Sequence, residues 1–338
     1  MAGTTPLFDR TLGCLLGGLI GDAIGTPTEN MTYEAIEERF GWVDDFDCDG
    51  TDDTVMKVLL ADALIATDGY ATLDDWARQW REQSGEIFGP KVGKFFQSVL
   101  HTAAKLKLHS TPRMAALGNM PSSSSAMCIS PVGIVNACNP TTAAAQAYGL
   151  AGLIHQYDVG FCQDGAAAMA AAVAAACDPG ADRDSIVAAA IGAILPWSGE
   201  PMRQVIGDIM EIARTRGEYK AFRADVYGQG QRFFQRITCD SRETVPITLA
   251  LIWLADGDVE KCVIYGANFG RDADTIASMA GAVAGAFAGA GGIRSDWVKK
   301  AIDVSARDQE RLAQDLVATT LRKSERESAA IEKLGRLI

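Results

Sequence analysis

Several residue types and patterns are scarce in this 338-residue sequence. It has only three histidines, and its eight cysteines include no CxxC pair, so no zinc-type cluster is recognisable. The net charge of −12 argues against partnership with nucleic acid or an anionic membrane surface. The apolar stretches are shorter than the ~20 residues of a membrane span. We therefore expect a cytoplasmic protein with reduced cysteines, no nucleic-acid partner and no membrane partner.

Extended runs with alternating polarity are almost absent, whereas apolar residues recur at three- and four-residue spacing along the chain. No linker or low-complexity segment divides it. The pattern predicts an all-α fold in a single domain over residues 1–338, with 298–338 as a solvated helical extension. The predicted helices are Thr11–Gly25, Thr54–Thr67, Leu73–Gln83, Val92–Leu106, Thr141–His155, Gly165–Ala176, Arg183–Leu195, Met202–Arg216, Glu218–Arg232, Val245–Leu254, Val259–Asn268, Thr275–Ala288 and Ser295–Arg322.

Glycine recurs every four residues in two of these segments. The two sets are Gly13, Gly17, Gly21 and Gly25, and Gly281, Gly285 and Gly289. Because four residues are about one helical turn, each set lines one face of a helix. A glycine inside a helix costs about 0.5–1 kcal/mol relative to alanine, so we expect very close helix packing in compensation. Direct contact of these glycines with a ligand is the alternative.

Two acidic clusters lie far apart in the sequence. Six aspartates lie between positions 44 and 53, ending in the run 51–54 (Thr-Asp-Asp-Thr), and the second cluster is the run 272–275 (Asp-Ala-Asp-Thr). Both lead directly into a predicted helix, where aspartate and threonine are favoured caps. Two close carboxylates are more than capping needs, and they repel each other. A bound cation would relieve the repulsion if the clusters meet; separate solvated caps are the alternative.

The oxygen donors of the two clusters favour a hard cation such as Mg²⁺, Mn²⁺ or Ca²⁺ over Zn²⁺. Enough carboxylates are present for two ions ~4 Å apart, an arrangement that orients hydroxyls and activates water for hydrolysis. The spacing of Asp45, Asp47, Asp49 and Gly50 also matches the start of an EF-hand calcium loop. Met56 stands where that loop needs a bidentate glutamate, which disfavours this interpretation.

A set of short motifs occurs in a characteristic order between Leu12 and Gly292. The motifs are Gly21-Asp22-Ala23-Ile24-Gly25 followed by Glu29, Thr51-Asp52-Asp53-Thr54, Ser125-Ala126-Met127, His155, Asp272-Ala273-Asp274-Thr275 and Gly281-x-x-x-Gly285-Ala286. Together they resemble the ADP-ribosylglycohydrolase family, which includes the dinitrogenase-reductase-activating glycohydrolase and the ADP-ribosylarginine and ADP-ribosylserine hydrolases. The resemblance implies a compact orthogonal helical bundle with a two-metal site in a cleft. It also implies hydrolysis of a ribosyl glycosidic bond.

The resemblance assigns roles to individual residues. The implied ligands of two Mg²⁺ or Mn²⁺ ions are Thr51, Asp52, Asp53, Asp272, Asp274 and Thr275. The implied catalytic residues are Asp52, Asp53 and Glu29, and which of them takes the proton stays open. The expected substrate-binding residues are Ser124, Ser125, Ala126, Met127, His155 and Arg271. A lone histidine such as His155 is more often a structural hydrogen-bonder than a catalyst. Asp22 is expected to be structural and to hold the loop of Glu29.

The sequence departs from the family pattern near the expected substrate loop. Ser122–Ser125 stand where the family is usually glycine-rich, Cys128 where an arginine is usual, and Arg271 where a second glycine is common. Serine restricts how closely a backbone approaches a diphosphate.

Three hypotheses therefore stay open. The first is a metal-dependent hydrolase that removes ADP-ribose from a modified protein or small molecule. The second is the same two-metal site acting on a smaller N-ribosyl substrate, a nucleoside or nucleotide. The third is a catalytically silent binding or structural relative.

Overall fold

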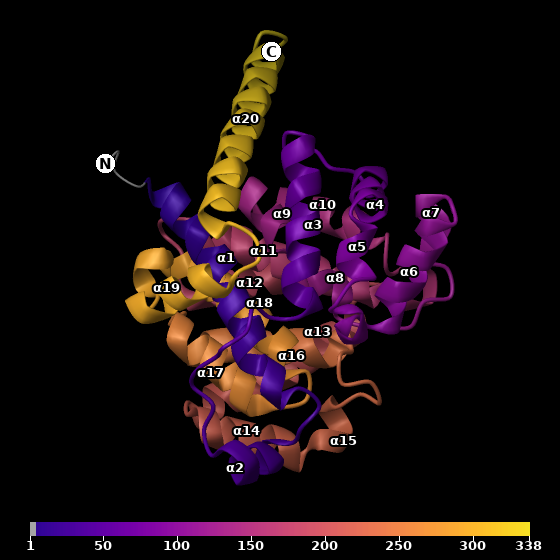
Figure 1. The fold of residues 1–338 in the computed structure, drawn as a ribbon. Coiled ribbons are helices and arrows are strands. Elements are labelled where there is room, and N and C mark those ends of the chain that lie inside the picture. Colours follow the sequence, from indigo (N-terminus) through magenta and orange to yellow (C-terminus); the bar gives the residue numbers. More distant parts are fainter. Residues whose placement is uncertain (1–4) are drawn as a thin grey trace.

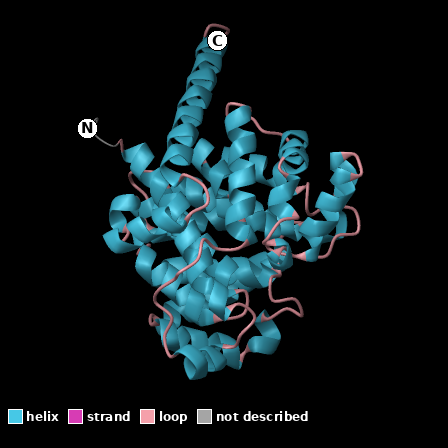
Figure 2. Cartoon of the chain, viewed as in Figure 1, coloured by secondary structure: helices cyan, strands magenta, loops and turns pink. Residues whose placement is uncertain are grey.

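The computed structural model describes residues 5–338, and it contains helices and loops but no strand over that range (Figures 1 and 2). The prediction of an all-α fold is confirmed. Its α-helices are α1 (Pro6–Gly25), α2 (Tyr33–Phe40), α3 (Asp52–Ala66), α4 (Leu73–Glu82), α5 (Ser84–Ile87), α6 (Gln97–Lys107), α7 (Pro112–Ala115), α8 (Ser124–Met127), α9 (Ser130–Val135), α10 (Pro140–Ala151), α11 (Phe161–Ala176), α12 (Arg183–Ala193), α13 (Glu200–Arg216), α14 (Tyr219–Gly228), α15 (Gly230–Phe233), α16 (Ser241–Leu254), α17 (Val259–Phe269), α18 (Ala273–Ala288), α19 (Ser295–Val304) and α20 (Gln309–Gly335). Short 3-10 helices lie at η1 (Thr26–Thr28), η2 (Val92–Lys94), η3 (Tyr157–Val159) and η4 (Ala290–Gly292).

Most of the long helices begin and end within a few residues of the predicted bounds. The continuous helix predicted over Ser295–Arg322 is wrong, because α19 ends at Val304 and α20 begins at Gln309. Asp308 accounts for the new start, since its side chain accepts a hydrogen bond from the backbone N–H of Arg311 and caps α20. Short helices such as α2 and α7–α9 lack a long apolar period and are absent from the predicted set.

The antiparallel pair α1 and α18 forms the centre of the molecule (Figure 1). Their glycine faces meet, and a Cβ added at Gly17 would overlap the carbonyl group of Gly281. A Cβ added at Gly13 would likewise overlap the carbonyl oxygen of Gly285. The two backbones therefore touch with no side chain between them, which confirms the close packing expected from the glycine spacing. As a result, the end of α1 lies beside the start of α18.

Helix α20 is partly buried in its first turns and exposed in its later turns. Leu312, Ala313 and Leu316 are buried, and this first part packs on α1, α3 and α9. The later turns project from the body of the protein, and Ile331 is exposed (Figure 1). The extension predicted to be solvated over 298–338 is thus partly buried, because the first turns of α20 belong to the core. The assignment of residues 1–338 to one domain stays a prediction. Over residues 5–338, the structure contains no helix with the length and apolar character of a transmembrane segment.

Candidate metal centre and active site

The two acidic clusters meet at one cavity of about 330 Å³. Asp52 and Asp53 reach it from the first turn of α3, while Asp272, Asp274 and Thr275 reach it from the start of α18. The remaining lining residues, which form the wall and mouth, are Glu29, Asn30, Lys94, Phe96, Ser123, Ser124, Met127, Arg236, Ile237, Thr238 and Cys239. The convergence expected from the sequence is therefore present.

Asp22 positions the start of α3 from within α1. Its buried carboxylate accepts hydrogen bonds from the backbone N–H groups of Thr51 (2.9 Å) and Thr54 (3.0 Å). It also accepts from the hydroxyls of Thr51 (2.8 Å) and Thr54 (2.6 Å). A side chain from a neighbouring helix thus replaces the local cap of α3. Asp22 is structural as expected, but the partner expected for it is wrong: it holds residues 51–54 rather than the loop of Glu29.

The loop of Glu29 is held by the segment that leads into α18. The backbone N–H of Asn30 donates to the carbonyl of Arg271 (2.6 Å), and the N–H of Arg271 donates to the carbonyl of Met31 (2.8 Å). At the mouth of the cavity, the Glu29 carboxylate pairs with the ammonium of Lys94 at 3.1 Å. The Glu29 loop is therefore tied to the second acidic cluster through main chain and to the cavity wall through one ion pair.

The carboxylates of the floor, together with Glu29 at the mouth, are arranged as cation ligands. One oxygen each from Glu29, Asp272 and Asp274 lie within 4.8 Å of one another. The second carboxylate oxygen of Asp53 is buried without a hydrogen-bond partner, and its first lies 3.4 Å from the hydroxyl of Thr275. An unpartnered buried carboxylate oxygen is costly unless something positive meets it. The donors are all oxygen, so the residues fit a hard divalent cation such as Mg²⁺ or Mn²⁺.

Burial perturbs the acids of this floor strongly. It raises the pKa of Asp52 and of Asp53, and the charge of Asp22 adds to the rise in both. Burial and the neighbouring Asp272 raise the pKa of Asp274. Burial and Glu29 raise the pKa of Asp272 to about 7. The physical cause throughout is the gathering of like charges away from water, which a bound cation would reverse.

The four consecutive serines at positions 122–125 face two different ways. Ser123 and Ser124 line the cavity, and the hydroxyl of Ser123 donates to Asp272 at 3.1 Å. Ser122 and Ser125 point the other way, each 2.9 Å from one ring nitrogen of the fully buried His155. Burial lowers the pKa of His155 to about 3, so the ring is neutral at physiological pH. His155 therefore anchors the loop from behind the cavity.

Arg271 lies outside the cavity lining. Its guanidinium forms two hydrogen bonds with the buried carboxylate of Glu243, at 2.6 and 2.8 Å, and packs over the ring of Phe234. The side chain expected to meet substrate is thus already occupied inside the protein. What Arg271 supplies to the site is its backbone, which adopts φ +61° and clamps the Glu29 loop.

Six of the predicted site residues line the cavity at its acidic floor and mouth: Asp52, Asp53, Asp272, Asp274, Thr275 and Glu29. Of the predicted substrate-binding residues, Ser124 and Met127 line it, whereas Ser125, Ala126, His155 and Arg271 do not. Thr51 lies just beneath, with its hydroxyl directed at Asp22.

Sequence reasoning missed three other lining residues, Lys94, Phe96 and Arg236. None of these belongs to a recognisable motif. Only the fold brings the segments around residues 94 and 236 to the cavity, so no sequence signal could have identified them.

The EF-hand interpretation is excluded by geometry. Asp45 pairs with Lys300 at 2.8 Å and Asp49 with Lys91 at 2.9 Å, and neither lines the acidic cavity. Met56, at the position of the required glutamate, is buried in α3.

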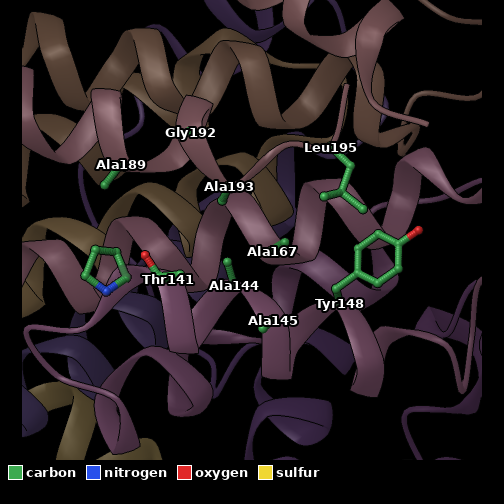
Figure 3. Close-up of a pocket in the computed structure, with 10 residues that line it drawn as sticks. Thr141, Ala144, Ala145, Tyr148, Ala167, Ala189, Gly192, Ala193 and Leu195 are labelled. Carbon is green, nitrogen blue, oxygen red and sulfur yellow. The ribbon is translucent and has the colours of Figure 1, made fainter. Parts of the chain in front are cut away.

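A second, larger cavity of about 600 Å³ lies among α10, α11 and α12 (Figure 3). Small side chains such as Ala144, Ala167 and Ala193 line it, together with Tyr148 and Leu195. No carboxylate, histidine or cysteine is among its lining residues, so it offers no group for hydrolysis.

A cavity floored with several carboxylates suits metal-assisted hydrolysis, and the family of the chain identifies the class of bond that is cleaved. The chain belongs to the ADP-ribosylglycohydrolase family, whose model matches residues 3–326. It is thus a glycosidic-bond hydrolase of the ADP-ribosylglycohydrolase type.

Two curated relatives are similar over most of their length. The chain is 26% identical to YegU, an uncharacterized protein of Escherichia coli strain K12, covering 84% of this chain and 89% of that protein. It is 25% identical to the ADP-ribosylarginine hydrolase Tri1 of Pseudomonas putida strain GB-1, covering 91% and 78%.

A solved structure described as an ADP-ribosylglycohydrolase-related protein complex superposes with a TM-score of 0.66 at 21% identity. The match covers 93% of this chain and 99% of the other. At that identity the likeness supports the fold alone.

Proposed function

We propose that the protein is a divalent-metal-dependent hydrolase that removes ADP-ribose from a modified protein side chain or small molecule. The observation that carries this proposal is the convergence of residues 52–53 and 272–275, with Glu29, on one cavity. The proposed ligands of two Mg²⁺ or Mn²⁺ ions are Thr51, Asp52, Asp53, Asp272, Asp274 and Thr275. Bound ions of this kind polarise substrate oxygens and lower the pKa of water.

The chain's own residues supply orientation and proton transfer. Glu29 lies at the mouth, between the acidic floor and Lys94, where a carboxylate can exchange a proton with a substrate that enters. Asp52 and Asp53 are the other candidate bases. Ser123 holds Asp272 in place from the wall. Asp22 acts through residues 51 and 54 and is a positioning residue.

The basic and aromatic side chains that line the cavity suit the rest of the substrate. Lys94 and Arg236 bring two positive charges to a cavity whose floor is negative. Guanidinium and ammonium groups are the usual partners of phosphate. Phe96 offers an aromatic edge for a base. This mixture of carboxylates and cations supports a substrate that carries both ribose hydroxyls and phosphates. The name of the relative Tri1 makes ADP-ribosylarginine the first substrate to test.

A smaller N-ribosyl substrate is the second candidate function. The cavity of about 330 Å³ is at the lower end of the range for small-molecule sites, roughly 300–1,000 Å³. The side chains of Ser123 and Ser124 also occupy the wall. A nucleoside or nucleotide would fit this volume. The presence of every proposed ligand argues against the third hypothesis, a catalytically silent relative.

The proposal includes a cytoplasmic location. All eight cysteines are free thiols, which suits a reducing compartment.

The test measures hydrolysis of ADP-ribosylarginine, ADP-ribosylserine and a panel of nucleosides and nucleotides, with Mn²⁺ or Mg²⁺ and with a chelator. Asp274→Ala should lower kcat/KM at least 100-fold, because it removes a carboxylate from the acidic floor. Asp45→Ala is the matched control. Asp45 belongs to the first acidic cluster but pairs with Lys300 outside the cavity, so this variant should retain activity. Turnover that survives both the chelator and Asp274→Ala would refute the proposal.

A further inference from the structure

A buried lysine lies directly beneath the acidic floor. Lys57 on α3 is only 3% exposed, and its ammonium lies 3.3 Å from the hydroxyl of Ser278 on α18. The same ammonium lies against Gly18 on α1, where a Cβ would collide with it. The absence of a side chain at Gly18 therefore provides the space for this charge.

Each of these three residues is one helical turn from a residue of the acidic site. Lys57 follows Asp53 by four positions on α3, and Ser278 follows Asp274 by four on α18. Gly18 precedes Asp22 by four on α1. Residues four apart on a helix are neighbours on one face. The ammonium thus lies in the next layer below the carboxylates, at the junction of the three helices that carry them.

The charge of Lys57 affects the pKa of an aspartate in the acidic floor. The positive charge of Lys57 opposes the rise in the pKa of Asp53 that burial and the neighbouring aspartates cause. Because Lys57 is enclosed by protein, its field is screened far less than that of Lys94, whose side chain is 41% exposed at the mouth.

Arg236 aside, the charges of the site balance when Lys57 is included. The carboxylates at or next to the cavity are those of Asp22, Glu29, Asp52, Asp53, Asp272 and Asp274. Two divalent ions would neutralise four of these negative charges. Lys94, which pairs with Glu29, and Lys57 would neutralise the other two.

We propose that Lys57 is an internal counter-ion of the metal site: it holds the carboxylates together before the ions bind, and it weakens divalent-cation binding by repulsion. It is a positioning residue, since it acts through Asp53 and does not line the cavity. The inference rests on the proposed metal site and adds to it a determinant of affinity.

The expected effect is a gain of affinity when the charge is removed. A buried positive charge one helical turn below the ligands of a divalent ion repels that ion, and at an effective dielectric near 20 this repulsion weakens ion binding by well over tenfold. Lys57→Met and Lys57→Gln should therefore bind Mn²⁺ at least tenfold more tightly than the parent protein. Lys57→Arg, which keeps the charge, should remain within about threefold. The direction distinguishes this role from a structural one, because a damaged site would bind more weakly.

Two control variants separate charge from packing. Ser278→Ala removes the hydrogen-bond partner of Lys57 and leaves its charge, so Mn²⁺ affinity should stay within threefold. Lys323→Met removes the other lysine that is 3% exposed, which lies on α20 beside Asn136 and Gln146, away from the site. This variant should also leave the affinity unchanged.

The measurement is Mn²⁺ titration of metal-free full-length protein, with free Mn²⁺ quantified by electron paramagnetic resonance. The Mn²⁺-induced rise in Tm is followed in parallel and should be larger in the neutral variants. Unchanged or weaker binding in Lys57→Met and Lys57→Gln would overturn the role of Lys57, as would failure of both to fold even with saturating Mn²⁺. Absence of Mn²⁺ binding by the parent protein would instead overturn the proposed metal-dependent function.

Discussion

Replacing Gly17 by alanine should separate the two central helices. A Cβ at this position would lie 2.9 Å from the carbonyl carbon of Gly281 and closer still to its oxygen, where ordinary contacts begin near 3.4 Å. The obstacle is backbone on both sides, so no rotamer change can relieve it. Helices α1 and α18 must therefore move apart by several tenths of an ångström or more along an interface that is otherwise closely packed.

The net cost follows from two opposing effects. Overpacking a rigid core typically costs ~1–3 kcal/mol, and a backbone–backbone overlap belongs at the upper end of that range. Alanine returns ~0.5–1 kcal/mol through its higher helix propensity. We expect Gly17→Ala to lower the free energy of unfolding by about 2 kcal/mol. The matched control is Gly207→Ala in α13, where a Cβ meets nothing within 4 Å. It should be neutral or stabilising by up to ~1 kcal/mol.

Urea denaturation followed by circular dichroism measures both variants. Because α1 and α18 also carry parts of the acidic site, Mn²⁺ affinity should fall in Gly17→Ala and not in Gly207→Ala. If Gly17→Ala proves as stable as Gly207→Ala, the account of these helices as touching backbones is wrong.

Three further predictions concern the acids. Asp22→Asn should destabilise the protein by about 2 kcal/mol and weaken Mn²⁺ binding at least tenfold in a titration, since its carboxylate orders the start of α3; unchanged affinity would contradict that role. Metal-free protein should lose stability as pH rises from about 4 towards 7, because the folded-state pKa of Asp272 is raised to about 7 while the unfolded chain releases that proton near pH 4. Urea midpoints across this range should fall without metal and fall less with Mn²⁺, and a midpoint that rises throughout would refute the sign. Glu243→Gln should lower the free energy of unfolding by ~1–3 kcal/mol, because it leaves Arg271 without its counter-ion. Adding Arg271→Met to this variant should restore part of the lost stability. A double variant less stable than Glu243→Gln alone would argue against this account.

The helices and the meeting of the acidic clusters could be predicted because they depend on repeating or local signals. Four-residue glycine spacing predicts a helix face that packs closely against another helix, and in the structure the glycine faces of α1 and α18 pack against each other. The break between α19 and α20 could not be found from apolar spacing, because residues 305–308 make up about one helical turn and the spacing on either side stays in phase. Only the cap at Asp308 marks the new start.

The sequence did not predict which side chains of the site point into the cavity. Ser124 and Ser125 are adjacent, yet one lines the cavity and the other binds His155, because α8 turns successive side chains to different faces. Arg271 looked available to a substrate until the fold placed Glu243 beside it from a different helix. Lys94 reaches the cavity from the short 3-10 helix η2 and Arg236 from the loop before α16, and no local sequence pattern encodes either placement.

Direct main-chain contact between α1 and α18 has a consequence for how the cavity can change. The spacing of its acidic base is set by the contact between the glycine faces of the two helices and by Asp22, and neither these glycines nor Asp22 line the cavity. The upper rim comes from separate connecting stretches near residues 94, 123 and 236. Ser123 and Lys94 are bonded to Asp272 and Glu29, so substitutions of these two residues alter the hydrolytic groups together with the rim. Substitutions at Arg236 can instead change which molecule is accepted while the hydrolytic groups keep their mutual distances.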